Sequence, residues 1–396
     1  MKRLRFTTAG ESHGPGLTAI LNGMPAGMPV DFELIRRDLK RRQHGYGRGR
    51  RMQIEQDEVE VRGGIRGSET LGSPICLWIA NRDYRNWEKV MGAREIDPRL
   101  AEKKRLRTPR PGHADLAGGL KFLRRDLRDV LERASARESA ARVAGGAFAK
   151  MLLRLFGVEI RSGVRSLGPI GAGLPTPSWR DLEGVDDDSP LRAIAKELEP
   201  EMVALVDAMR DQGDTLGGAV TVIAHGVPAG LGSTAQWDEK LDGRLAQAML
   251  SVPAIKAVEI GAALAASAGP GSQAHDGIAR SGDGEGGRWV RTTNHAGGLE
   301  GGITNGEDVV VTLYKKPIST LRRGMPSVDL DTLEARVSQY ERSDVTALPA
   351  AGVIGEAMMA LIVADALLEK IGGDSFAELV AHYERTLELQ KSWPRP

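Results

Sequence analysis

Residues 352–368 read GVIGEAMMALIVADALL, the most apolar window of the 396-residue chain. A membrane span requires roughly 18 consecutive uncharged apolar residues, and this window contains Glu356 and Asp365. The window therefore predicts a helix that is buried in a protein core, and we expect no membrane-spanning segment.

Shorter periodic segments lie along the rest of the chain. Apolar spacing typical of helices recurs in residues 31–45, 135–157, 191–211, 240–250 and 375–390. Asp31 is placed to cap the first of these helices, and Ser135 and Glu138 form a capping-box pattern at the start of the second. Strands are predicted at residues 53–61, 75–79, 158–164, 219–224, 289–293 and 309–313. This irregular alternation favours one large α/β domain over residues 1–396, with two lobes as the alternative.

Charge and cysteine content narrow the class of protein. Lysine and arginine number 54 against 53 aspartates and glutamates, so no global charge attracts nucleic acid or a membrane surface. Cys76 is the single cysteine, which excludes an internal disulfide framework and favours a reducing compartment. The first ten residues carry Lys2, Arg3 and Arg5 but lack the apolar core of a signal sequence, so we predict a cytoplasmic protein. The acidic residues 179–201 are predicted to form a surface excursion.

Glycine-rich clusters that also carry Arg, His or Ser are the main chemical signal of this sequence. They lie at residues 9–14, 41–51, 107–115 and 294–306. They are accompanied by the glycine-rich segment 213–218 and by the segments 133–138, 316–320 and 341–344, which contain no glycine. Glycine lets a backbone approach a ligand closely, and arginine binds phosphate through two parallel hydrogen bonds. The clusters therefore predict an anion-binding pocket whose histidines act as acid or base.

Several clusters also have a simpler interpretation. His13 could be a hydrogen-bonded structural residue, Ser135 could cap a helix, and residues 41–51 could bind a nucleic acid backbone. The seven histidines are scattered without metal-ligand spacing, and no Walker A loop, Rossmann fingerprint or G-x-S-x-G motif is present. No metal site is predicted. The residues alone lead to a phosphorylated substrate or cofactor and to acid–base chemistry.

The motifs and their order resemble those of the chorismate synthases from end to end. The matching segments are AGESHG (9–14), GYGRG (45–49), RPGHAD (110–115), ERASARE (132–138), GDTLGG (213–218), AGG (296–298), KPIST (316–320) and RSD (342–344). The resemblance implies the family's α+β fold, a single-domain β-α-β sandwich with helices between antiparallel sheets. It also implies assembly as a homotetramer.

The same resemblance implies a reaction. 5-Enolpyruvylshikimate 3-phosphate loses its 3-phosphate and a C6 hydrogen by anti-1,4-elimination and gives chorismate, the last step of the shikimate pathway towards aromatic amino acids. Reduced FMN (FMNH2) is the implied cofactor and undergoes no net redox change. His13 would protonate the departing phosphate, His113 would act near flavin N1, and Asp344 would act near flavin N5. Ser12 and Ser135 would support the hydrogen-bond network.

Binding residues are also implied by the resemblance. The residues matched to substrate anions are Arg42, Arg48, Arg137 and Arg342. The residues matched to flavin contacts are Arg133, Ala134, Ser135, Pro253, Ala254, Gly301, Lys316, Pro317, Ile318, Ser319, Thr320 and Arg342. Pro253 stands where the family usually has Asn or Gln, so it offers neither a side-chain amide nor a backbone N–H. The reductant is left open between NADPH, with Arg42 and Arg48 as contacts, and a separate flavin reductase.

Two other functions compete with this one. A flavin oxidoreductase would share the FMN contacts but would oxidise or reduce its substrate, and a nucleic-acid-binding protein would use the arginines of residues 41–51. Near-zero charge and few aromatic residues count against the second. Residues 103–142 nevertheless contain twelve Lys or Arg against five Asp or Glu. This segregation predicts a local basic pocket for one small polyanionic substrate, without a nucleic acid or membrane partner.

Overall fold

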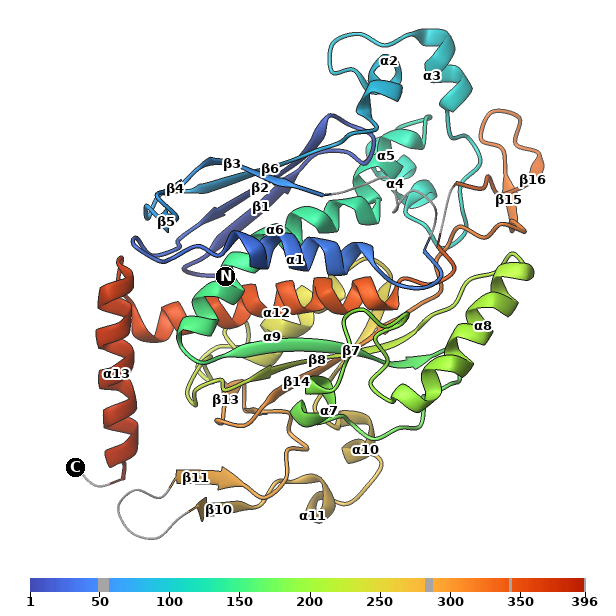
Figure 1. The fold of residues 1–396 in the computed structure, drawn as a ribbon. Coiled ribbons are helices and arrows are strands. Elements are labelled where there is room, and N and C mark those ends of the chain that lie inside the picture. Colours follow the sequence, from blue (N-terminus) through green and yellow to red (C-terminus); the bar gives the residue numbers. More distant parts are fainter. Residues whose placement is uncertain (49–56, 282–287, 342–343, 395–396) are drawn as a thin grey trace.

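The apolar window lies inside α12 (Leu348–Ile371) in the computed structural model, which describes residues 1–48, 57–281, 288–341 and 344–394. Helix α12 runs between two sheets, together with α1 (Phe32–Gln43) and α6 (Ser139–Leu155) (Figure 1). By length and composition α12 is the one helix in the described part of the chain that could cross a membrane, but 94% of its most apolar window is buried within the protein. The prediction of a buried core helix is confirmed.

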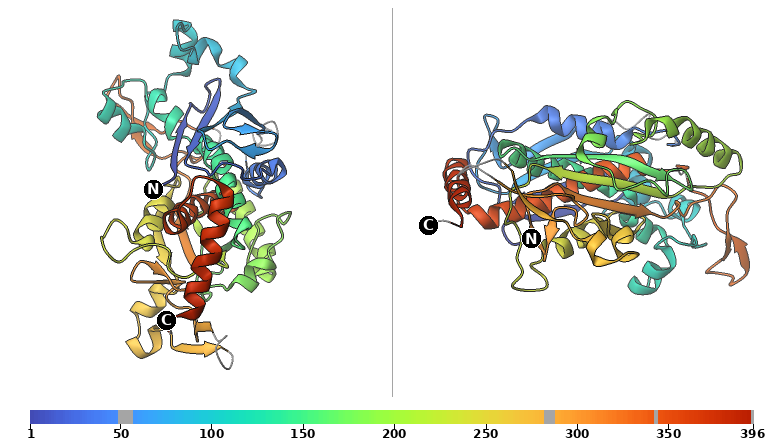
Figure 2. Two further views of the ribbon diagram at one scale, coloured as in Figure 1. Left: turned by 90° about the vertical axis from the view of Figure 1, so that its left-hand side faces the viewer. Right: turned by 90° about the horizontal axis from the view of Figure 1, so that it is seen from below.

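The two main sheets each have four antiparallel strands. The first sheet has the order β1-β2-β6-β3 and consists of β1 (Arg5–Ala9), β2 (Gly16–Asn22), β6 (Ile75–Ala80) and β3 (Val59–Gly63). The second has the order β7-β8-β14-β9 and consists of β7 (Glu159–Leu167), β8 (Gly218–His225), β14 (Val309–Lys315) and β9 (Ile255–Ile260). Seen from below, the strands of the second sheet run along α12 (Figure 2). Helices between antiparallel sheets make the β-α-β sandwich that the resemblance implied.

Shorter elements connect and cover these layers. The other helices are α2 (Glu88–Met91), α3 (Pro98–Lys104), α4 (Asp115–Phe122), α5 (Arg128–Ala134), α7 (Trp179–Glu183), α8 (Glu199–Asp211), α9 (Leu241–Leu250), α10 (Ala263–Ser267), α11 (Gly271–Ala274) and α13 (Phe376–Ser392), with 3₁₀ turns η2 (Tyr84–Asn86), η3 (Ala136–Glu138) and η4 (Lys196–Leu198). Four hairpins are β4–β5 (Ile65–Arg66, Glu69–Thr70), β10–β11 (Ile278–Ser281, Arg288–Arg291), β12–β13 (Leu299–Glu300, Ile303–Thr304) and β15–β16 (Pro326–Val328, Ala335–Val337). Helix α13 stands across one end of the layers (Figure 1).

Small residues let the helical layer pack closely in this aromatic-poor protein. A Cβ atom added at Gly146 of α6 would lie 2.5 Å from the Cβ of Ala357 in α12, and one added at Gly145 would lie 2.2 Å from the ring of Phe6 in β1. Both distances are far below van der Waals contact. Helix α6 therefore touches α12 on one side and the first sheet on the other.

The two acidic residues of the apolar window hold other elements in place. The Glu356 carboxylate, fully buried, accepts hydrogen bonds from Arg41 of α1 (2.8 Å), Lys150 of α6 (2.5 Å) and Ser162 of β7 (2.6 Å). Burial raises the pKa of this carboxyl, but the charges of Arg41 and Lys150 outweigh burial and hold its pKa well below the usual range. Asp365 accepts the backbone N–H groups of residues 2–4, at 2.7 Å for the last of them, and so fixes the start of the chain.

Of two predicted helix starts, one differs from the structure and one agrees with it. The predicted capping box is wrong: the Ser135 hydroxyl accepts the N–H of Arg137 at 3.3 Å, and the Glu138 carboxylate is bound instead by Thr8 (2.9 Å) and Arg142 (3.0 Å). A 3₁₀ turn therefore precedes α6. The first predicted helix is correct, since α1 is capped by the Asp31 carboxylate, which accepts two N–H groups.

The helix predicted over residues 191–211 begins only at Glu199. The carboxylate of Glu199 accepts the N–H of Leu191 at 2.8 Å, and Ala193 bridges to Val164 of β7, so hydrogen bonds to β7 hold residues 192–194 in place of a helical turn. Within the acidic segment, Asp187 pairs with Arg41 at 2.8 Å. For the strand predicted at 53–61, residues 53–56 lie outside the described residues and the observed strand begins at Val59.

Candidate active site

The loop after β1 presents His13 to the helix α5. The His13 ring nitrogen Nδ1 lies 2.9 Å from Oε1 of Glu132, and the backbone N–H of His13 donates to the Glu132 carboxylate at 2.7 Å. Burial raises the pKa of Glu132, but its hydrogen bonds to His13 and the charges of His13 and Arg128 outweigh burial and lower it. His13 is therefore a buried histidine held by an ionised carboxylate.

Two further groups join His13 from other segments. The hydroxyl of Ser135, at the end of α5, donates to the hydroxyl of Ser12 at 3.1 Å. The ring of Trp87 lies against the imidazole of His13, with 3.9 Å between ring centroids, and the guanidinium of Arg128 lies 5.0 Å from the Trp87 ring. The structure thus brings Ser12, His13 and Ser135 together, as the motifs predicted.

His113 lies in the loop before α4 and has a similar partner. Its Nδ1 lies 2.5 Å from Oδ1 of Asp115, whose carboxylate also accepts from Arg110 at 2.7 Å. Burial raises the pKa of Asp115, yet the hydrogen bonds of His113 and Arg110 lower it well below the ordinary value. Arg110 also donates to Thr320 at 3.1 Å, so this loop contacts the predicted flavin-binding segment.

One of the predicted flavin-binding segments, residues 316–320, contacts the His113 loop. Lys316 donates its side-chain ammonium to the carbonyl of Gly112 and its backbone N–H to the carbonyl of Ala254 at 3.0 Å. The carbonyl of Ile318 accepts from Thr215 at 2.7 Å. Residues 316–320 therefore lie between the His113 loop, the pair Pro253–Ala254 and the 213–218 cluster.

Two of the predicted substrate-binding arginines share one carboxylate. Arg42 donates to Asp57 at 3.3 Å, to Ser139 at 3.0 Å and to the carbonyl of Ala136 at 3.2 Å, and Arg137 donates to the other Asp57 oxygen at 2.5 Å. All of these donors are buried. Asp57 thus holds two guanidinium groups next to the start of α6.

Arg48 and Lys315 form a second cationic group. The guanidinium of Arg48 pairs with Asp344 at 3.3 Å. Lys315, at the end of β14, is buried beside this pair; burial, followed by the charge of Arg48, lowers the pKa of Lys315 to about 8. Within the described parts of the chain, the buried atoms Arg48 Nε, Gln43 Nε2 and Thr346 Oγ1 have no hydrogen-bond partner. Buried donors of this kind favour binding of an anion.

Some predicted residues stand apart from this centre. Arg133 directs its guanidinium to Thr8 (3.0 Å) and Gly10 (3.2 Å) at the surface beside Ala134. Gly301 lies in the turn between β12 and β13, near Thr234, and its neighbours come from that region rather than from the histidine loops. Arg342 lies outside the described residues. No group of His, Cys, Asp or Glu arranged to hold a metal ion occurs among the residues that the structure describes.

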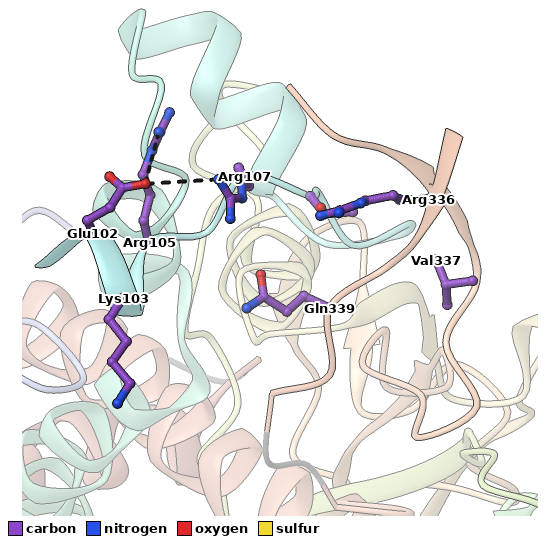
Figure 3. Close-up of a pocket in the computed structure, with 8 residues that line it drawn as sticks. Glu102, Lys103, Arg105, Arg107, Arg336, Val337 and Gln339 are labelled. Carbon is purple, nitrogen blue, oxygen red and sulfur yellow. Dashed lines mark ion pairs between the residues drawn. The ribbon is translucent and has the colours of Figure 1, made fainter. Parts of the chain in front are cut away.

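A basic cavity of about 520 Å³ opens beside the approach to the His113 loop (Figure 3). It is lined by Glu102, Lys103, Arg105, Arg107, Thr108, Arg336, Val337 and Gln339. Two of its cations are already paired, Arg105 with Asp331 at 2.8 Å and Arg336 with Asp329 at 3.0 Å. Acidic residues therefore balance the charge of two of the arginines that line this cavity.

Several residues of the site were not predicted as site residues from the sequence: Arg110 and Asp115, which lie in the matched segment 110–115, and Glu132, Trp87, Asp57 and Lys315. Glu132 lies inside the matched segment 132–138, so the motif itself could have pointed to it. The last three lie outside the matched segments, and only the fold shows what they contact.

Comparisons with known proteins agree with these observations. Residues 4–368 match the family model described as chorismate synthase. The chain is 50% identical over 396 residues to the chorismate synthase of Geobacter sulfurreducens (98% of this chain, 100% of the relative) and 50% identical over 396 residues to that of Moorella thermoacetica (97% and 99%). A solved structure described as a crystal structure of chorismate synthase is 42% identical, covers 98% of this chain and 99% of its own, and superposes with a TM-score of 0.79. The chain belongs to the chorismate synthase family, whose members are lyases.

Proposed function

We propose that this chain converts 5-enolpyruvylshikimate 3-phosphate into chorismate and phosphate by anti-1,4-elimination, with reduced FMN as cofactor. The observation that carries the proposal is the pairing of both motif histidines with buried carboxylates, His13 with Glu132 and His113 with Asp115. Such pairs hold an imidazole at a fixed position for proton transfer. In the reaction the C3–O and C6–H bonds break and the ring gains a double bond, so a proton must be supplied at one side and accepted at the other.

The residues around His13 suit the side of the departing phosphate. His13 donates a proton to the phosphate, and the Ser12–Ser135 hydrogen bond lies next to it. Arg42 and Arg137, fixed by Asp57, bind substrate anions. A substrate with two carboxylates and a phosphate needs several guanidinium groups when it leaves water. This requirement explains the cationic density of the site.

The donor set also fits a flavin nucleotide. Buried Arg48 Nε and Thr346 Oγ1 have no hydrogen-bond partner in the described parts of the chain, and the Lys315 ammonium is buried nearby. The flavin would be held by residues 316–320, Pro253–Ala254 and the Arg133–Ser135 segment. When bound, reduced FMN supplies transient electron density for phosphate loss with no net redox change. His113 would hold a proton at flavin N1, and Asp344 would accept the proton from C6 near flavin N5.

Burial favours substrate over NADPH as the partner of Arg42. The side chain of Arg42 is 5% exposed and is engaged by Asp57 and Ser139, so it suits a small enclosed anion better than a dinucleotide. A separate flavin reductase is then the simpler source of electrons. Family membership further supports a homotetramer in the cytoplasm, which size-exclusion chromatography with light scattering and cell fractionation test.

An anaerobic assay tests substrate, cofactor and reaction type together. The chain is mixed with 5-enolpyruvylshikimate 3-phosphate and chemically reduced FMN, and chorismate, phosphate and flavin oxidation are measured. We expect equal amounts of chorismate and phosphate and no net flavin oxidation. Consumption of one flavin per product would instead assign a flavin oxidoreductase. A second arm with oxidised FMN and NADPH decides whether the chain reduces its own flavin.

A further inference from the structure

Both motif histidines face a carboxylate that also binds an arginine, and at His113 that arginine, Arg110, in addition lies 3.0 Å from the ring nitrogen Nδ1. The oxygen Oε1 of Glu132 lies 2.9 Å from His13 Nδ1 and 3.2 Å from an amino group of Arg128. Likewise, Oδ1 of Asp115 lies 2.5 Å from His113 Nδ1 and 3.0 Å from an amino group of Arg110. Two segments of unrelated sequence thus build a histidine–carboxylate–arginine arrangement. The repetition points to a shared task for the two carboxylates, which is to fix the position of the histidine ring.

Glu132 shows this task most clearly because it binds both the ring and the backbone of the histidine. Its side chain is 1% exposed. Oε2 accepts the backbone N–H of His13 at 2.7 Å, Oε1 faces Nδ1, and the Glu132 carbonyl accepts the N–H of Ser12 at 3.0 Å. One residue of α5 therefore fixes the loop and the orientation of the imidazole together.

The remaining contacts of the ring complete its placement. Trp87 covers one face of the imidazole, and the ammonium of Lys104, at the end of α3, lies 4.8 Å from the centroid of the Trp87 ring. Arg128 binds Glu132 from within α5 and also pairs with Glu341 at 3.3 Å. Among the described residues, Glu132 is thus in direct contact with His13, while Arg128, Lys104 and Glu341 are linked to it through Glu132 and Trp87. Glu132 is the one whose carboxylate is hydrogen-bonded directly to the imidazole.

We propose that Glu132 is the positioning residue of the proposed proton donor: it keeps one imidazole hydrogen of His13 on Nδ1 in both protonation states, so that Nε2, directed away from α5, takes up the second proton and donates it from the imidazolium to the departing phosphate. A carboxylate without a proton accepts hydrogen bonds only, so an imidazole facing it must donate from Nδ1. Glu132 acts through His13 and not on the substrate. The inference rests on the proposed function for its kinetic consequence, while the tautomer itself is a property of the chain.

The substitution Glu132→Gln tests this arrangement with little change of shape. If the amide oxygen of the new side chain faces Nδ1, its NH₂ group meets the His13 backbone N–H and two donors oppose each other. If the amide is reversed, the NH₂ group donates to Nδ1 and forces the hydrogen to Nε2. Either way the imidazole loses its orientation or its tautomer.

The expected result is a change in kcat without a change in binding. We expect Glu132→Gln to lower kcat about 10–100-fold, by analogy with the loss of a carboxylate partner from a metal-bound histidine, with KM for the substrate within about twofold of the original. Neutron diffraction at alkaline pH should place the imidazole hydrogen on Nδ1 in the original chain and not in Glu132→Gln.

A matched control is Glu259→Gln. Glu259 is also a buried carboxylate that accepts from a backbone N–H (Leu264, 3.0 Å) and an arginine (Arg165, 3.4 Å), but it has no histidine partner. It should leave kcat unchanged. If Glu132→Gln keeps the original kcat, or if both variants lose activity and thermal stability alike, Glu132 has no positioning role. If the original chain makes no chorismate, the proposed function fails, and the neutron map still decides whether Glu132 fixes the tautomer.

Discussion

At the scale of single residues, His13 is the side chain on which the proposed proton transfer depends. The substitution His13→Ala should lower kcat about 10²–10⁴-fold, the range usual for loss of a general acid. Flavin binding should persist, because the hydrogen bond and the ring contact of His13 with described residues go to Glu132 and Trp87 and not to the predicted flavin-binding segments. Anaerobic kinetics and flavin titration measure the two effects. His225→Ala is the control, since His225 pairs with Asp308 and stacks on Trp179; unchanged turnover in His13→Ala would remove His13 from the mechanism.

Lys315 should make the stability of the protein depend on pH. Burial and the charge of Arg48 lower its pKa from 10.5 to about 8 in the folded chain. Between these values the unfolded chain binds more protons, so the free energy of unfolding should rise with pH, by about 3 kcal/mol at most. Urea unfolding at about pH 7.5 to 9.5 should show this rise in the original chain and lose it in Lys315→Met. The exposed Lys256→Met should retain the rise; a rise that survives in Lys315→Met would contradict the prediction.

At the scale of helices, the crossing of α6 and α12 depends on Gly146. In Gly146→Ala the new Cβ would lie 2.5 Å from the Cβ of Ala357 and 2.7 Å from its Cα. Because backbone atoms must move, we expect a loss of about 1–3 kcal/mol in the free energy of unfolding. Gly243→Ala in α9 is the counterpart, since its nearest neighbour lies 3.9 Å away, and it should stabilise by up to about 1 kcal/mol. Denaturant titration measures both; equal effects would refute the packing argument.

The helices also show which parts of the fold could be predicted from the sequence. The cores of α12, α1, α9 and α13 were predictable because their apolar residues agree with their tertiary packing, and at α1 the predicted cap Asp31 agrees as well. Residues 191–195 were not, because a carboxylate eight residues beyond Leu191 and an edge of β7 capture their backbone. In the candidate site, the roles of His13, His113 and the arginines stay predictions from the motifs. Trp87 and Asp57 were missed because only the fold brings them to their partners.

At the scale of the whole molecule, the charges buried around α12 join its layers. Glu356 contacts α1, α6 and β7 through Arg41, Lys150 and Ser162. Helix α6 in turn lies against Phe6 of the first sheet. The two ends of the chain are joined as well, since Ala26 exchanges backbone hydrogen bonds with residues 374 and 376. We therefore propose that the two sheets form one domain that unfolds as a single unit, and not two lobes.

The substitution Glu356→Gln tests this proposal, because it leaves the buried Arg41 and Lys150 without a full counter-charge. Removing one partner of a buried ion pair costs about 3–5 kcal/mol. If the molecule is one unit, amide hydrogen exchange should accelerate to a similar extent in β2 of the first sheet and in β8 of the second. Glu384→Gln on the exposed face of α13 should change neither. Faster exchange confined to the second sheet, or two separate unfolding transitions in the original chain, would instead show two lobes that unfold independently across the helical layer.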